Sequence, residues 1–96
     1  MKVRFTERAE EDIRDIGAYI RANSASGAEN IRRSIVATIA FLEEFPNLGR
    51  TTSKENIQVI ATRGYSFLIY YRQVRTSVVI LHIRHTSRNS PTSELL

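Results

Sequence analysis

The spacing of the apolar residues changes between the two halves of the chain. Before residue 46 they recur every three or four positions, which is the spacing of one face of an α-helix. After residue 56 they gather in short runs rich in Ile, Val, Phe and Tyr, separated by polar residues or Gly64, and such runs are typical of β-strands. We therefore expect helices in the first half and a sheet built mainly from the second.

The first helix is expected to begin after Thr6, whose hydroxyl can cap it. Acidic residues are favourable near the positive end of the helix dipole, and the first turns hold Glu7, Glu10, Glu11 and Asp12. One face of the helix is apolar and consists of Ala9, Ile13, Ile16 and Ile20. This amphipathic helix is predicted to end near Asn23.

The second helix is predicted to open with a capping-box pattern at residues 26–29, which begins with Ser26. Apolar residues then continue at helical spacing, at Ala28, Ile31, Ile35, Ile39, Leu42 and Phe45. Pro46 ends this helix, because the residue before a proline is pushed out of the helical region, and Gly49 supports a turn. Two tightly joined helices predict an antiparallel hairpin.

The remaining elements are expected to be strands. Residues 2–5 (KVRF) predict a short first strand, and three more are predicted at residues 57–61, 66–72 and 77–84, after a polar loop. The resulting order is βααβββ. It predicts a single α+β domain over residues 1–96, with the helix hairpin packed on an antiparallel sheet.

Charge is divided unevenly along the chain, whose formal net charge is +4. Residues 1–45 carry seven Lys/Arg and eight Asp/Glu, whereas residues 46–93 carry seven Lys/Arg and a single acidic residue, Glu55. A basic second half raises the local concentration of anionic partners, such as nucleic acid or an acidic protein segment. A basic surface that is merely solvated is the alternative.

Composition excludes several classes of site. The chain has no cysteine, so disulfides, thiolate metal sites and thiol nucleophiles are absent. With two histidines and no Gly-rich phosphate loop, we expect no metal and no cofactor. The first residues lack an apolar signal core, and the longest apolar stretch, residues 35–42, is far shorter than a membrane span. We expect a soluble cytoplasmic protein with no membrane contact.

Four segments, taken in their order and spacing, resemble the RelE/ParE superfamily of toxins from bacterial type II toxin-antitoxin systems. They are AEEDIRDIGAYI at residues 9–20, FLEEFPNLGR at 41–50, YSFLIYYR at 65–72 and VVILHIRHTSR at 78–88. The Pro-x-x-Gly-Arg turn and the His-x-x-Arg after the last strand look more like the ParE branch than the RelE branch. The resemblance covers nearly the whole chain and implies a RelE/ParE-like fold.

The resemblance also implies a function. ParE-type toxins poison DNA gyrase, so the favoured expectation is a gyrase inhibitor neutralised by a ParD-like antitoxin, which alone would contact operator DNA, in a plasmid-stabilisation system. RelE-type relatives cut mRNA on the ribosome, so an endoribonuclease is the first alternative. The second alternative is a non-toxic regulatory module that binds the antitoxin.

The two histidines lie in the segment ILHIRHTSRNSP, residues 80–91. Side chains alternate along a strand, so His82 and Arg84 should point to one face and Ile83 and His85 to the other, and the histidines should not share a site. If the strand ends near Arg84, His85 is released into the tail with Arg88.

RNA cleavage needs a general base, a general acid and cations around the phosphate. His85 is the candidate acid or base, with Arg50, Arg63 and Arg88 as cations. RelE-type nucleases, however, typically carry several lysines and a tyrosine near the C-terminus, whereas the tail TSRNSPTSELL has no tyrosine. This departure favours binding over cleavage, with the target contacted by Arg50, Arg63, Arg84, His85 and Arg88.

The antitoxin is expected to be an extended, acidic and apolar segment that folds as it binds the helix hairpin and a sheet edge. Tyr70 and Tyr71 fall on opposite faces of their strand, so one should pack in the core and the other lie on the open face. The candidate antitoxin contacts are Tyr19, Tyr70, Tyr71 and Arg72.

Overall fold

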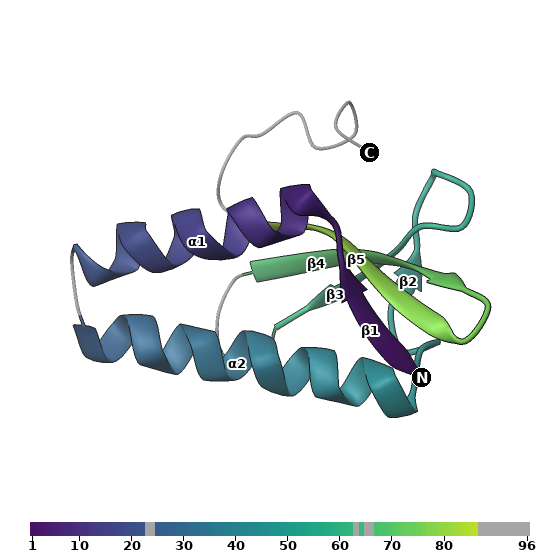
Figure 1. The fold of residues 1–96 in the computed structure, drawn as a ribbon, viewed down its shortest axis with the longest axis horizontal. Coiled ribbons are helices and arrows are strands. Elements are labelled where there is room, and N and C mark those ends of the chain that lie inside the picture. Colours follow the sequence, from purple (N-terminus) through teal and green to yellow (C-terminus); the bar gives the residue numbers. More distant parts are fainter. Residues whose placement is uncertain (23–24, 63, 65–66, 87–96) are drawn as a thin grey trace.

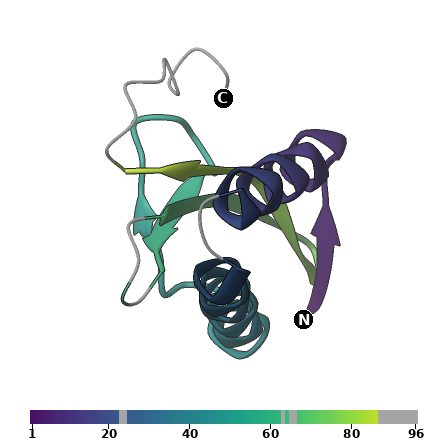
Figure 2. The same cartoon turned by 90° about the vertical axis from the view of Figure 1, so that its left-hand side faces the viewer.

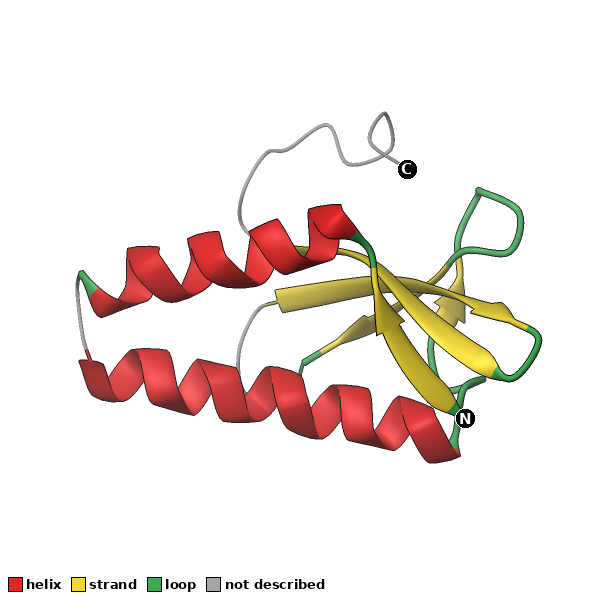
Figure 3. Cartoon of the chain, in the orientation of Figure 1, coloured by secondary structure: helices red, strands yellow, loops and turns green. Residues whose placement is uncertain are grey.

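The computed structural model describes residues 1–22, 25–62, 64 and 67–86. Its elements in chain order are β1 (Lys2–Phe5), α1 (Glu7–Arg21), α2 (Ala25–Glu44), β2 (Arg50–Thr51), β3 (Gln58–Ala61), β4 (Phe67–Val74) and β5 (Ser77–His85). The predicted α+β class and the strand-helix-helix-strands order are confirmed (Figures 1 and 3), and a two-residue strand, β2, is added to the prediction.

The start of α1 is as predicted, whereas the start of α2 is not. Thr6 caps α1 by accepting a hydrogen bond from the backbone N–H of Ala9 at 3.1 Å. In α2 the helix already begins at Ala25, so Ser26 is inside it and the capping-box prediction is wrong. Such a pattern locates a helix start only to within a residue or two. Helix α1 ends at Arg21 with Ala22 as its C-cap, close to the predicted end near Asn23. The side chain of Ala28 is outside the described residues.

The five strands form one sheet in the order β1-β5-β4-β3-β2. Three of its four pairings are antiparallel, but β1 lies parallel to β5, so the sheet is mixed rather than fully antiparallel. The cause is the helix hairpin, which returns the chain to its starting end: the Met1 ammonium donates to the carbonyl of Glu43 at 2.9 Å. After the helices the chain enters the sheet at β2, the edge strand opposite β1, and each later strand lies one position nearer to β1.

Each face of the sheet has its own apolar cluster. The larger one lies between the sheet and the helices and includes Ile35, Leu42, Ile69, Tyr71 and Ile83. The smaller one, on the face away from the helices, consists of Ile57, Val59 and Tyr70, flanked by Leu68 and Leu81. Both helices cover the same face (Figure 2). The helix stripes therefore form the core as predicted, except that Phe45 lies beyond α2 and is 54% exposed.

The pairing of β4 with β5 contains a bulge. Tyr70 is opposite His82 but Tyr71 is opposite Ile80, so Leu81 is an extra residue in β5. Because of it, Ile80 and Ile83 both reach the helix-side core although three positions separate them. The strand extends one residue beyond its predicted end at Arg84, through His85, which pairs with Phe67. The condition under which His85 would be released into the tail is therefore not met.

Candidate functional site

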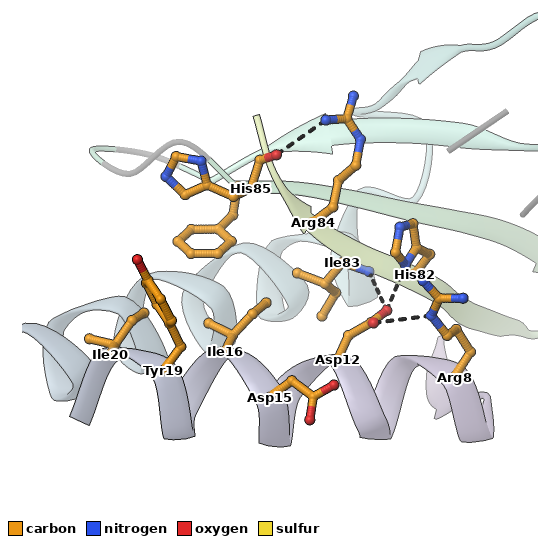
Figure 4. A pocket seen from close by; sticks show the side chains of 11 residues that line it. Arg8, Asp12, Asp15, Ile16, Tyr19, Ile20, His82, Ile83, Arg84 and His85 are labelled. Carbon is orange, nitrogen blue, oxygen red and sulfur yellow. Dashed lines mark hydrogen bonds and ion pairs between the residues drawn. The ribbon is translucent and has the colours of Figure 1, made fainter. Parts of the chain in front are cut away.

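A cleft of about 510 Å³ lies between α1 and the end of β5 (Figure 4). Helix α1 supplies Arg8, Asp12, Asp15 and Tyr19 to its wall, and β5 supplies His82, Arg84 and His85. The cleft therefore gathers cationic, anionic and aromatic groups from segments about 70 residues apart in the sequence. It is the place where polar side chains of the two layers meet.

The cleft exists because β1 is shorter than β5. β1 ends at Phe5, opposite Ile80, and beyond that point no strand in the described part of the chain pairs with this edge of β5. Thr6, the N-cap of α1, supplies the next hydrogen bonds to this edge. Its N–H donates to the carbonyl of Ile80 at 3.1 Å, and its hydroxyl donates to the carbonyl of Leu81 at 3.1 Å. The next edge group, the N–H of Ile83, donates to Asp12 Oδ2 at 3.0 Å. A helix cap and a carboxylate thus complete the hydrogen bonding of the strand edge.

Asp12 accepts three hydrogen bonds, from His82 Nδ1 at 2.6 Å, from the Ile83 N–H at 3.0 Å and from Arg8 Nε at 3.1 Å. Burial raises the pKa of this carboxyl, but the bonds from His82, Ile83 and Arg8 outweigh burial, so the net pKa lies below the ordinary 3.8. Asp12 is therefore ionised at neutral pH. An ionised acceptor at 2.6 Å places the ring proton of His82 on Nδ1.

His82 is an interior residue, 4% exposed. Its ring stacks on Tyr70, with centroids 5.9 Å apart and planes inclined by 24°. Its Nε2 is buried and has no hydrogen-bond partner among the residues that the structure describes. The guanidinium carbon of Arg84 lies 6.0 Å from the same Tyr70 ring, on the same side of β5. The geometry of His82 is that of a side chain that ties a helix to a sheet rather than one that meets solvent.

His85 lies on the opposite side of β5 and packs edge-on against Phe67, with centroids 5.1 Å apart and an interplanar angle of 83°. The predicted alternation of His82 and Arg84 against Ile83 and His85 therefore holds beyond the bulge. Both histidines nevertheless border the same cleft, which the alternation argument did not anticipate, because the cleft wraps around the exposed edge of β5. His85 is half-buried and is the more accessible of the two.

A second polar network holds the turn after α2. The hydroxyl of Tyr71 donates to the carbonyl of Pro46 at 2.8 Å and accepts from the N–H of Gly49 at 2.8 Å. Gln58 Nε2 donates to the carbonyl of Gly49 at 3.1 Å, and Gln73 Nε2 donates to the carbonyl of Pro46 at 3.2 Å. A methyl group at Gly49 would approach the Tyr71 oxygen to 2.5 Å, so only glycine fits here. This network fixes the position of the turn, and Arg50, the next residue, begins β2, where it pairs with Val59 and is exposed.

The other predicted site residues are distributed over both faces. Tyr70 and Tyr71 lie on opposite faces as predicted, and both are buried, Tyr71 completely. Tyr19 is 61% exposed on α1, and Arg72 is exposed on β4. The cleft thus combines Tyr19, Arg84 and His85, whereas Arg50 and Arg72 are not among its lining residues. Arg63 and Arg88 are outside the described residues.

Asp12 is the site residue that the sequence argument missed, since it was assigned only to the helix dipole. A signal was present: Asp12 is three residues after Ala9 and four before Ile16, so it borders the apolar stripe that faces the sheet. An acidic residue at such a position needs donors from the layer on which the helix packs. Its partner, His82, was identifiable as a strand histidine but not as the one that Asp12 reaches.

No group of three His, Asp or Glu side chains suited to a metal ion occurs within residues 1–22, 25–62, 64 and 67–86. In the same ranges, neither helix combines the length and the apolar character that a membrane span requires.

Comparison with solved structures shows that this chain has the fold of the RelE and ParE toxins. A chain of the chromosomal ParDE toxin-antitoxin system of P. aeruginosa superposes with a TM-score of 0.79 at 20% identity, covering 91% of this chain and 97% of that one. The isolated E. coli RelE toxin gives a TM-score of 0.59 at 16% identity, covering 97% and 92%. A chain of the intact E. coli RelBE complex gives 0.58 at 15% identity, covering 91% and 98%. At these identities the likeness shows the fold.

Sequence comparison defines the family. The family of ParE toxins of the type II toxin-antitoxin system parDE matches residues 3–90, and the chain therefore belongs to it. Y4kP of Sinorhizobium fredii, a protein named as a candidate toxin, is 27% identical over 90 residues, which are 94% of this chain and 93% of the relative. The predicted membership of the superfamily, on its ParE side, is confirmed.

Proposed function

We propose that this ParE-family toxin inhibits DNA gyrase by binding it, in the cytoplasm, and that a ParD-like antitoxin neutralises it. The observation that carries the proposal is the family match across residues 3–90. His82 has a structural position, because its hydrogen bond to Asp12 and its stacking on Tyr70 hold the ring in the interior. This position supports binding over cleavage. Plasmid stabilisation, and operator contact only through the antitoxin, belong to the same proposal.

The target-binding surface in this proposal is cationic. It includes Arg84 and His85 at the cleft and Arg50 on β2, and we assign Arg63 and Arg88 to it from the sequence alone. Cations placed around a cleft attract anionic groups and raise association rates, and no proton transfer is required of them.

Antitoxin binding is supported by a groove of about 400 Å³ between α1 and α2. Its floor is apolar, and charged side chains along its rim include Arg14, Arg21 and Arg32. Glu29, the acidic residue there, is already paired with Arg32 at 3.2 Å and Arg33 at 3.3 Å. An acidic and apolar partner segment complements such a groove.

The second candidate is a ribosome-dependent endoribonuclease. It is favoured by the position of His85, which borders the cleft together with Arg8 and Arg84, so that a titratable imidazole and two cations surround one space. The RelE-like fold is compatible with this function but does not select it.

Supercoiling by purified gyrase, measured with and without the chain, tests the proposal, and mRNA cleavage on ribosomes tests the second candidate. Under the binding proposal, His85→Gln retains most inhibition while Arg84→Ala loses much of it, because charge matters more than titration. Under the nuclease alternative, His85→Gln lowers cleavage by roughly a hundredfold or more. Gyrase that is unaffected by a folded chain contradicts the proposal, and normal growth on expression indicates the non-toxic regulatory module.

A further inference from the structure

A groove of about 670 Å³ lies between α2 and β3, on the side of α2 that faces away from the groove shared by α1 and α2. We call it the α2–β3 groove. Leu48, Ile60 and Ala61 form one wall, and the α2 residues that form the other are Asn30, Arg33, Ser34, Ala37, Thr38 and Phe41. None of these α2 residues lines the groove between the helices. Within the described part of the chain, α1 is the only other helix, and it lies on the other side of α2 (Figure 2).

Large apolar side chains are exposed along this groove. Phe41 is 58% exposed, Phe45 54% and Leu48 53%. They are neighbours, because the N–H of Phe45 donates to the carbonyl of Phe41 at 2.8 Å and that of Leu48 donates to Phe45 at 3.1 Å. Beside them, Ser34 and Ala37 are small and leave room for a ring that enters from outside. Two phenylalanines and a leucine exposed together are typical of an interaction surface.

The charges on this side of α2 complement those of a second copy that runs in the opposite direction. Arg33, Ala37, Phe41 and Glu44 follow one another at spacings of four, four and three, so they lie along one line of the helix. The line has a cation at its start and an anion at its end. Two such helices placed antiparallel bring Arg33 of each copy opposite Glu44 of the other. Within the described residues Arg33 has an exposed pairing with Glu29 at 3.3 Å, and Glu44 is exposed without an ion pair.

We propose that the α2–β3 groove joins two copies of this chain in an antiparallel dimer with twofold symmetry. In such an interface one patch serves both copies, so it must contain both a protruding group and the cavity that receives it. Phe41 is the protruding group. The register that Arg33 and Glu44 set brings it against Ser34 and Ala37 of the second copy. This interface goes beyond the proposed function, and it covers neither the cleft between α1 and β5 nor the groove between the helices.

The dimer is expected to be weak. One pair of crossed helices with a flanking strand gives an interface at the small end of the range for specific complexes, below about 1,200 Å² in total. Each copy also carries a formal net charge of +4, so the two repel each other at long range. We expect a dissociation constant of about 10 to 100 µM.

Sedimentation equilibrium of the purified chain, from about 5 to 500 µM, spans this dissociation constant on both sides. Ala37→Glu keeps a good helix former but brings a carboxylate from each copy close to the twofold axis. The dissociation constant should therefore rise by at least about tenfold. Ala18→Glu, at an exposed position on α1, is the matched control and should change it by less than about threefold.

Two results of this experiment overturn the proposal. One is a chain that stays monomeric at about 500 µM. The other is a dimer that Ala37→Glu and Ala18→Glu weaken equally. If the chain is monomeric and Ala37→Glu instead weakens binding of the antitoxin encoded beside it, the groove belongs to the antitoxin and not to a second copy.

Charge reversal tests the antiparallel register. Arg33→Glu and Glu44→Arg should each raise the dissociation constant by about threefold to tenfold, because each places like charges opposite one another. The double variant should return to within about threefold of the parent, since the two charges have only exchanged places. A double variant as weak as the product of the two single effects overturns the proposed pairing. Circular dichroism of each variant confirms that the helices are retained.

Discussion

Two polar networks fasten this fold, and they differ in chemistry. At the turn after α2, the Tyr71 hydroxyl and two glutamine amides bind backbone groups, and no charge takes part. At the corner between α1 and β5, the ionised Asp12 accepts from two side chains and one backbone N–H. The turn therefore depends on close steric fit and the corner on charge. Mutations and pH should affect the two differently.

The largest effect is expected at the turn, from Gly49→Ala. The new Cβ would lie 2.5 Å from the Tyr71 oxygen and 2.9 Å from the carbonyl oxygen of Val59, and backbone must move to admit it. We expect a loss of about 2 to 3 kcal/mol in the free energy of unfolding, measured by denaturant titration. Gly17→Ala on α1 is the matched control.

At Gly17 the atoms nearest to the new Cβ belong to the guanidinium group of Arg21, the first at 3.1 Å, and this flexible side chain can move away. Helix propensity then favours alanine by up to about 1 kcal/mol, so this variant should be as stable as the parent or more so. Equal losses at Gly49 and Gly17 would show that steric fit at the turn is not what distinguishes them.

Asp12→Ala should have the next largest effect. It leaves the Nδ1–H of His82 and the N–H of Ile83 without an acceptor in a buried setting, at a cost of about 2 kcal/mol. Asp15→Ala, one turn along the same helix and exposed, should stay within about 0.5 kcal/mol of the parent. Thermal melts of both variants measure the difference. Similar losses in the two would mean that Asp12 matters only for the helix dipole.

These two networks also show what the sequence could and could not predict. Proline, glycine and arginine at residues 46–50 indicate a turn by local rules, but Tyr71 is 22 positions from Gly49, and its role depends on which face of β4 meets the turn. Asp12 and His82 are 70 positions apart, and their contact depends on where β1 stops and where β5 bulges. Apolar periodicity predicts layers, whereas strand length and register, which follow from tertiary packing, decide the polar contacts between them.

Tyr71→Phe should cost about 1 to 2 kcal/mol, because the ring still fills the core while the N–H of Gly49 loses its acceptor. Tyr70→Phe is the control: the Tyr70 hydroxyl makes no hydrogen bond to the residues that the structure describes, so we expect a change within about 0.5 kcal/mol. Urea midpoints of the two variants give the comparison. If Tyr70→Phe lowers the urea midpoint more than Tyr71→Phe does, the Tyr70 hydroxyl on the outer face contributes more to stability than the Tyr71 hydroxyl at the turn.

The two networks should fail at opposite ends of the pH scale. The Asp12 pKa is lower in the folded chain than its ordinary 3.8, so its stabilisation is complete above that value and is lost as the pH falls through the folded pKa. Burial raises the Tyr71 pKa above 10.0, against the opposing bond from Gly49, so its stabilisation is complete below 10.0 and lost as the pH rises further.

Melting temperatures across pH separate these contributions. Asp12→Asn should reduce the fall in melting temperature at acid pH and leave the fall at alkaline pH unchanged. Tyr71→Phe should reduce the fall at alkaline pH and leave the fall at acid pH unchanged. If the melting temperature falls equally at acid pH in the parent and in Asp12→Asn, other carboxylates dominate acid unfolding.

The smallest effect is expected from Arg8→Ala. Arg8 donates to Asp12 from an exposed position, with 45% of its side chain accessible, so solvent and salt screen the pair. Exposed pairs four residues apart on a helix stabilise by about 0.3 to 0.5 kcal/mol, and Asp12 keeps its bonds from His82 and Ile83. We expect a loss of about 0.5 kcal/mol or less in denaturant titration, shrinking further in about 1 M salt. A loss as large as that of Asp12→Ala, and independent of salt, would mean that the charge of Arg8 is needed to balance the Asp12 carboxylate. The α1–β5 contact would then depend on three groups acting as one unit.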